Sequence, residues 1–138
     1  DVIRRQRQMC IRDRHRIRLT DVHIDYEGSC AIDETILNAS DICEYEMLHI
    51  YNLANGNRFT TYAIKAEKDS GIVSFNGAAA FQGKVNDLII ICTYTQLEAS
   101  EVKNHKPKLV YFKKNENTID FIKSTIPLQK AKIVNYNV

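Results

Sequence analysis

Short apolar runs separated by turn residues make up most of this 138-residue chain. Residues 88–95 (LIIICTYT) form its most apolar and β-branched run, which predicts a central core strand. Residues 15–26 alternate loosely and predict a strand with one irregularity, and residues 47–53, 72–75 and 109–112 predict further strands. Six or so short strands with turns between them indicate an all-β fold, a small β-barrel with short helices.

Turn and capping signals place some of the element boundaries. Asn55-Gly56 is typical of a type I′ turn, so residues 47–53 and 58–66 are expected to pair as a hairpin. Asp33 can cap a short helix over residues 34–39, where apolar side chains recur on one side. The predicted barrel therefore includes one hairpin and one short helix.

Composition and charge limit the class of protein. A hydrophobic content of 44% with five Gly and two Pro is typical of one globular domain of this length. The net charge of +2 hides an arginine-rich start, because residues 1–18 hold seven of the eight arginines. The remaining chain is mildly acidic and has no basic face interleaved with aromatic residues, which disfavours nucleic-acid binding.

The first 14 residues differ from the rest of the chain. The string "RRQRQMCIRDR" resembles translated sequencing-adapter read-through joined to a truncated reading frame. Residues 1–14 are therefore predicted to be a non-native or disordered basic arm, and residues 15–138 to form a single domain. No apolar run approaches the ~20 residues that span a bilayer, so no membrane segment is predicted.

Cysteine and histidine spacing favours neither a disulfide framework nor a metal site. The cysteines form no C-x-x-C pair and are interpreted as reduced thiols of a cytoplasmic protein: Cys10, Cys30, Cys43 and Cys92. The histidines lack metal-ligand spacing: His15, His23, His49 and His105.

Gly28-Ser29, within "DYEGSCAID", allows three interpretations: a plain turn, a hydrolase nucleophile or a self-cleavage site. In self-cleavage the Ser29 hydroxyl attacks the preceding carbonyl, and elimination and hydrolysis then leave a pyruvoyl group at the new chain start. A glycine at position 28 helps, because it tolerates unusual backbone angles and shields the carbonyl least. The dipeptide alone favours a plain turn. A serine hydrolase is no better supported, because the chain lacks the G-x-S-x-G motif.

Two later segments offer binding and proton-transfer groups. Arg58 is the only arginine after residue 18, and its guanidinium can grip a carboxylate. Tyr62, four residues on, shares the expected strand face and can donate a proton. In "NGAAA" at residues 76–80, small side chains let backbone N–H groups approach a ligand. Taken singly, an exposed hairpin strand and a tight turn explain these segments better.

In this order and at this spacing, the segments resemble the pyruvoyl-dependent aspartate 1-decarboxylases. The resemblance rests on "YEGSCAID", "NGNRFTTYAI", "GIVSFNGAAA", "VNDLIIICTY" and "HKPKLVYF", and runs from about His15 to Ile126. It implies a double-psi β-barrel that forms a homotetramer in the bacterial cytoplasm. It also implies decarboxylation of L-aspartate to β-alanine and CO₂, which feeds pantothenate synthesis.

The resemblance further implies cleavage between Gly28 and Ser29, giving a β chain of residues 1–28 and an α chain of residues 29–138. The pyruvoyl cofactor made from Ser29 would form a Schiff base with the substrate amine. Tyr62 would return a proton to the carbanion, and Arg58 would hold a carboxylate. Substrate-contact positions are matched by Thr61, Gly77, Ala78 and Ala79, and processing or supporting positions by Gly28, Asn76, Tyr26 and His15. Cys30 is expected to be a bystander.

One position departs from the pattern of the resembled family. Members usually carry a Lys two residues before the histidine that matches His15, where it helps hold the substrate; Asp13 stands there in this chain. Either a native Lys was lost with the arm, which is the favoured interpretation, or the chain binds aspartate poorly. The alternative function is therefore a non-catalytic small β-barrel binding module that never matures.

Overall fold

The computed structural model describes residues 6–131, and for residues 6–15 it describes the backbone alone. Strands and short helices follow one another along this part of the chain. They are β1 (Gln6–Arg18), β2 (Asp21–His23), β3 (Ser29–Asp33), α1 (Glu34–Ala39), β4 (Met47–Asn52), β5 (Arg58–Ala66), β6 (Val73–Asn76), the 3₁₀ helix η1 (Gly77–Gln82), β7 (Leu88–Glu98), the 3₁₀ helix η2 (Val102–Asn104), β8 (Lys108–Phe112) and β9 (Ile119–Lys123).

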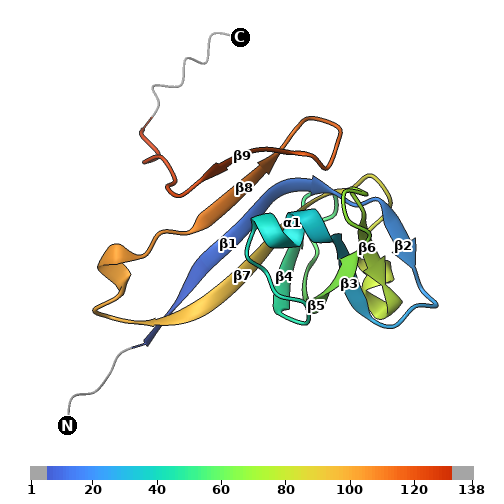
Figure 1. Ribbon diagram of the computed structural model, residues 1–138, viewed down its shortest axis with the longest axis horizontal. Coiled ribbons are helices and arrows are strands. Elements are labelled where there is room, and N and C mark those ends of the chain that lie inside the picture. The colour runs from blue at the N-terminus through green and yellow to red at the C-terminus, as the bar shows by residue number, and fades with distance from the viewer. Residues whose placement is uncertain (1–5, 132–138) are drawn as a thin grey trace.

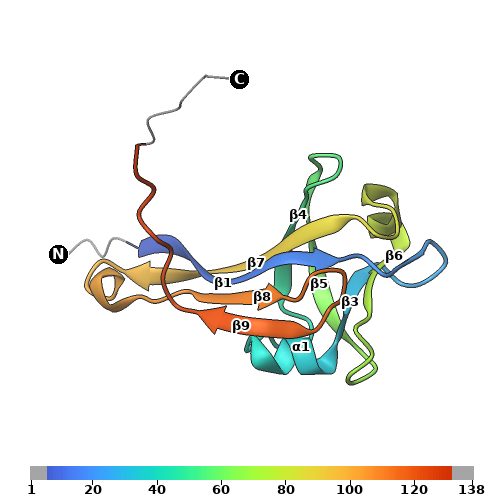
Figure 2. The same cartoon turned by 90° about the horizontal axis from the view of Figure 1, so that it is seen from above.

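The strands of this described part join in one sheet, in the order β2-β6-β3-β5-β4-β7-β1-β8-β9. The long strands β7 and β1, with β8 and β9, extend as a ribbon to one side, as Figure 2 shows from above. The shorter strands curl together at the other side, with α1 lying against them (Figure 1). The sheet is thus a curled half-barrel, and the prediction of a β-rich fold with short helices is confirmed.

One apolar core holds the curled part of the sheet together. Strand β4 contributes Leu48 and Ile50 to this core, and its alternate residues His49 and Tyr51 point to the opposite face, where they are half-buried. The fully buried large side chains are Ile17, Leu19, Ile32, Ile36, Leu37, Leu48, Ile50, Val73, Phe75, Ile89 and Ile91. Burial contributes roughly 1.5–3 kcal/mol for a side chain of this size, so these residues dominate the stability of the half-barrel.

Three local predictions are confirmed. β7 pairs with β4 on one side and with β1 on the other, so the apolar run at residues 88–95 is a central strand. β4 and β5 pair antiparallel as the expected hairpin, but the Asn55-Gly56 turn is not of type I′, because Gly56 has φ +76° and Asn55 has no positive φ. The Asp33 carboxylate caps α1 by accepting the N–H of Thr35 at 2.8 Å.

The prediction of one strand over residues 15–26 is wrong. β1 ends at Arg18, β2 ends at His23, and Tyr26 lies in the turn that follows. The strand divides because Leu19 donates its N–H to Asp87 at 2.9 Å, whereas Thr20 donates to Val73 at 2.8 Å. The chain therefore leaves the β7 side of the sheet and crosses to β6 between two consecutive residues.

The basic arm lies partly outside the described residues. The backbone of residues 6–14 runs within β1, where it pairs with β7 and β8. That these residues are foreign to the natural chain stays a prediction. Within the described part, no helix combines the length and the apolar character needed to cross a membrane.

Candidate active site

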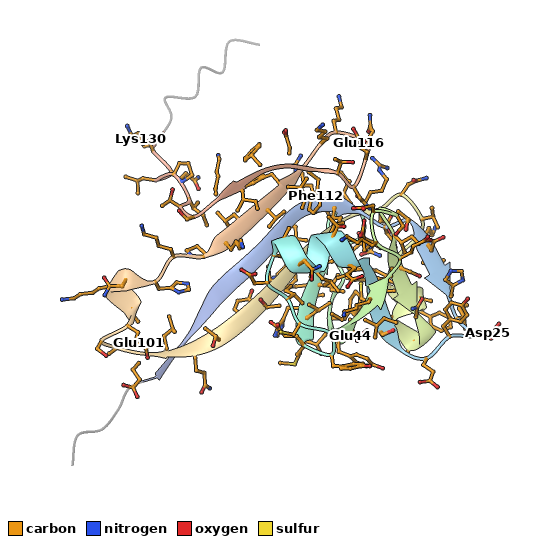
Figure 3. The ribbon with its side chains drawn as sticks, in the orientation of Figure 1. Asp25, Glu44, Glu101, Phe112, Glu116 and Lys130 are labelled. Atoms are coloured by element: carbon orange, nitrogen blue, oxygen red, sulfur yellow. The ribbon has the colours of Figure 1, made fainter. Side chains whose placement is uncertain are left out.

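The turn before β3 places Ser29 at the start of a fully buried strand. Ser29 is 1% exposed, and its hydroxyl donates to the carbonyl of Glu27 at 3.2 Å. Its backbone pairs with Asn76 of β6, and the next residue, Cys30, pairs with Ala63 of β5. Figure 3 shows Asp25 at the outer end of the same turn. Two neighbouring strands therefore hold the serine, while the residues just before it are exposed.

A close backbone contact fixes this turn from the other side. Gly77, the first residue of η1, has φ +63°. A Cβ atom on Gly77 would stand 2.7 Å from the Cα of Gly28 and 3.0 Å from the carbonyl oxygen of Tyr26. Because real Cβ atoms essentially never come so close, only a glycine at position 77 lets η1 approach the turn in this way.

Gly28 itself is less constrained than its place beside Ser29 suggests. It is absent from the glycines with positive φ, and a Cβ built on it meets no atom within 4 Å. The expectation that Gly28 supplies unusual backbone angles is therefore not met, and the conformational requirement lies at Gly77. The lower shielding of the Gly28 carbonyl remains a prediction.

A pocket of about 390 Å³ opens beside Ser29, a volume within the usual range for small-ligand sites. Its lining is formed by Gly28, Ser29, Phe59, Thr60, Thr61, Tyr62, Ala78, Ala79 and Gln82. Six of these residues were expected in the site, and the pairings of β3 with β5 and with β6 bring them together. Because Cys30 pairs with Ala63, Ser29 lies beside Tyr62 across β3 and β5.

Arg58 does not line this pocket. It lies in a neighbouring pocket of about 320 Å³ with His49, Tyr51, Phe59 and Thr60. Arg58 and Tyr62 are on the same face of β5, and four residues of extended strand separate their Cα atoms by about 13 Å. The two pockets share Phe59 and Thr60 and are therefore adjacent.

The other expected site residues lie around the Ser29 pocket. Asn76 is 3% exposed and accepts a hydrogen bond from the Ser74 hydroxyl at 2.8 Å. Tyr26 is exposed, and its ring contacts that of His23 with centroids 4.7 Å apart. The backbone of His15 pairs with Tyr111, while its side chain lies outside the described residues, as does that of Asp13.

Sequence reasoning missed Phe59, Thr60 and Gln82 as pocket residues. Thr60 could have been found, since strand alternation places it on the same face as Arg58 and Tyr62. Phe59 lies on the other face, edge-on to Phe75 with centroids 5.1 Å apart. No sequence signal indicated Gln82, because it reaches the pocket through the fold of η1.

Two other kinds of chemistry receive no support from the geometry. Cys30 is fully buried and does not line the pocket, and its expected role as a bystander stays a prediction. Among the described residues, no group of three His, Cys, Asp or Glu side chains is placed to hold a metal ion. The lining of the pocket beside Ser29 includes the hydroxyl-bearing residues Thr60, Thr61 and Tyr62.

Comparisons with known proteins find a matching family and similar chains. Residues 5–119 match the family described as aspartate decarboxylase. The aspartate 1-decarboxylase of Methylobacillus flagellatus is 50% identical over 126 residues, which cover 91% of this chain and 99% of that protein. The aspartate 1-decarboxylase of Nitrosococcus oceani is 50% identical over 117 residues, covering 85% and 92%. That of Chromobacterium violaceum is 48% identical over 126 residues, covering 91% and 99%.

Proposed function

The chain belongs to the aspartate decarboxylase family, and we propose that it decarboxylates L-aspartate to β-alanine and CO₂ with a pyruvoyl group made from its own Ser29. The observation that carries this proposal is the position of Ser29. It is buried at the start of β3, in the wall of a pocket that also holds Thr61 and Tyr62. A carbonyl group formed at this position would lie in the same pocket as Thr61 and Tyr62, which leave opposite faces of β5.

Self-cleavage comes first in the proposal. The Ser29 oxygen adds to the Gly28 carbonyl carbon, the Ser29 nitrogen leaves, and the peptide becomes an ester. Loss of the Ser29 α-proton expels the Gly28 carboxylate, and water then replaces the nitrogen, which leaves as ammonia. Thr61 lines the pocket beside Gly28. We propose that its hydroxyl donates a hydrogen bond to the Gly28 carbonyl oxygen as negative charge develops there.

Decarboxylation follows in the same pocket. The pyruvoyl group supplies the electron sink for the carbanion left when CO₂ departs. Tyr62 has 38% of its surface exposed, and we assign to its hydroxyl the return of a proton to that carbanion. A positioned acid of this kind contributes typically ~10²–10⁴-fold to the rate. Ala78 and Ala79 leave room for the substrate, because neither carries a side chain beyond Cβ.

Carboxylate binding by Arg58 uses a second copy of the chain in this proposal. Arg58 lies in the adjacent pocket, and its Cα is about 13 Å along β5 from that of Tyr62. A homotetramer lets the Arg58 of one copy face the Ser29 pocket of another. Mixed oligomers of Arg58→Ala and Tyr62→Phe copies should then regain activity that neither variant has alone.

The proposal also includes the barrel topology and the cellular location of the enzyme. Parallel pairs β3–β5 and β2–β6 lie within a mostly antiparallel sheet, which supports the double-psi β-barrel topology. As the family resemblance implies, the enzyme would act in the bacterial cytoplasm, and its β-alanine would enter pantothenate synthesis.

Intact-mass analysis of the purified full chain tests this function. We expect two fragments that split between Gly28 and Ser29, a larger fragment whose mass and blocked start match a pyruvoyl group, and β-alanine formed from L-aspartate. A single uncleaved chain without β-alanine would contradict the proposal. That outcome would favour the non-catalytic binding module, and Asp13→Lys would then test whether the altered start is the cause.

A further inference from the structure

Arg58 lies over the ring of Tyr51. The guanidinium carbon is 4.2 Å from the ring centroid, within the range of a cation–π contact. Tyr51 and Arg58 are opposite each other in the β4–β5 pairing, so both side chains leave the same face of the sheet. Arg58 is exposed, whereas Tyr51 is half-buried. The aromatic ring therefore supports a cation that would otherwise be free to move in solvent.

The ring of Tyr51 is itself held from the next strand. Its hydroxyl and that of Tyr94 in β7 are 2.6 Å apart, the distance of a short hydrogen bond. The Tyr94 ring stands edge-on to that of His49, with centroids 4.8 Å apart and an interplanar angle of 86°. A line of contacts thus runs from His49 through Tyr94 and Tyr51 to Arg58, across β7, β4 and β5.

The charge of Arg58 is not neutralised by a carboxylate among the described residues. The two side-chain ion pairs of that part of the chain are Lys65–Glu34 and Lys108–Asp41. An aromatic face stabilises a guanidinium without consuming its hydrogen-bond donors, which stay available for a planar carboxylate. Arg58 held in this way can still bind an anion, whereas an arginine in a structural ion pair could not.

We propose that Tyr51 and Tyr94 are positioning residues for substrate binding. The Tyr51 ring fixes the angle at which the Arg58 guanidinium meets a substrate carboxylate, and the Tyr94 hydroxyl fixes that ring. The inference rests on the proposed function, in which Arg58 takes a carboxylate of L-aspartate. It assigns neither tyrosine a contact with the reacting atoms, so both act on substrate affinity.

A positioning role predicts an effect on substrate affinity and none on the turnover rate. An arginine that must be ordered on binding loses rotamer freedom each time, whereas a guanidinium already held on a ring has lost it beforehand. Removing the ring should therefore raise KM and leave kcat near that of the wild type. Chain cleavage at Ser29 should be unchanged, because Tyr51 and Tyr94 are absent from the Ser29 pocket.

The test compares variants of the full chain, with rates expressed per cleaved chain from intact-mass analysis. Tyr51→Leu should raise the KM for L-aspartate by about three- to ten-fold, the range expected for loss of one cation–π contact. The inhibition constant of succinate, a dicarboxylate without a reactive amine, should rise by the same factor. Tyr51→Trp, which keeps an aromatic face, should restore both values toward the wild type.

Two hydroxyl deletions test the second half of the proposal. Tyr51→Phe and Tyr94→Phe should each raise KM by about two-fold. The double variant should raise KM no further, because both substitutions remove the same hydrogen bond. These variants also decide the question if Tyr51→Leu does not fold. Tyr45→Phe is the matched control, since Tyr45 is 71% exposed and lines neither pocket.

Unchanged KM and succinate inhibition in a cleaved, active Tyr51→Leu enzyme would overturn the inference. A loss of kcat without a change in KM would overturn it as well, because the ring would then act on the chemistry. Failure of the proposed function has a different signature. In that case the wild type itself remains uncleaved, or Arg58→Ala leaves the KM of an active enzyme unchanged.

Discussion

The buried polar side chains at the two ends of β3 differ in how well they are hydrogen-bonded. At one end the Asp33 carboxylate, 3% exposed, accepts three backbone N–H groups: Thr35 at 2.8 Å, Asp69 at 2.9 Å and Gly71 at 2.8 Å. At the other end the Ser29 hydroxyl, 1% exposed, has one bond of 3.2 Å to the Glu27 carbonyl.

The difference indicates which buried polar group is structural and which is reactive. Asp33 ties α1 and the residue 69–71 turn to the end of β3, so its hydrogen bonds are part of the fold. Ser29 has a single, long hydrogen bond, and Gly77 comes close to the backbone of Gly28, the residue before it. A group held by three partners has little freedom to react, whereas a group with one weak partner can turn to a new one.

Ser29→Ala should have the largest effect on this comparison. Without the hydroxyl, no ester can form, so we expect an uncleaved chain and complete loss of β-alanine production. The fold should persist, because the substitution removes one weakly bonded atom from a buried site. Intact mass, an activity assay and thermal unfolding measure the three results. Cleavage between residues 28 and 29 in this variant would contradict the assigned role.

Gly77→Ala should have the next largest effect. The new Cβ would require the Gly28 backbone to move, and displacement of a reacting group by about 1 Å can cost on the order of 10²-fold in rate. We therefore expect cleavage about 10²-fold slower, followed by mass spectrometry over time. Gly56→Ala is the matched control, because it has a similar φ of +76° and no atom within 4 Å of its Cβ. Equal slowing in both variants would show that backbone strain, not the contact with Gly28, is responsible.

Asp33→Asn should affect stability and leave the chemistry at Ser29 intact. The amide keeps one acceptor oxygen but turns its NH₂ group toward backbone donors, so at least one buried N–H loses its partner. The expected cost is about 2 kcal/mol of unfolding free energy, measured by urea denaturation of the uncleaved Ser29→Ala chain. Asp69→Asn, at an exposed carboxylate that accepts from Thr35, is the control and should cost less. Slower cleavage in a folded Asp33→Asn variant would contradict this separation and show that the two ends of β3 are functionally coupled.

The sequence was informative where structure depends on neighbours along the chain. The Asn55-Gly56 turn predicted the β4–β5 hairpin, and Asp33 was recognised as the cap of α1. The break between Leu19 and Thr20 could not be predicted, because it depends on their bonds to Asp87 and Val73, more than fifty residues away.

The site shows the same division. The family resemblance brought Ser29, Thr61 and Tyr62 to one pocket before any register was known, and the structure places them in its wall. Their roles in catalysis stay predictions. The separate pocket of Arg58 and its support by Tyr51 depend on which residues face each other across β4 and β5, which local sequence patterns do not encode.

Gly28→Ala should have the smallest effect, although Gly28 donates the bond that is cut. Its Cβ would enter open space, and its φ is not positive, so an alanine meets neither a clash nor a forbidden conformation. An exposed substitution of this kind costs within about 0.5 kcal/mol, and we expect cleavage within about three-fold of the wild-type rate. If Gly28→Ala instead slows cleavage as strongly as Gly77→Ala, shielding of the Gly28 carbonyl matters as much as its position. The contact at Gly77 would then be one of two backbone requirements at this end of β3.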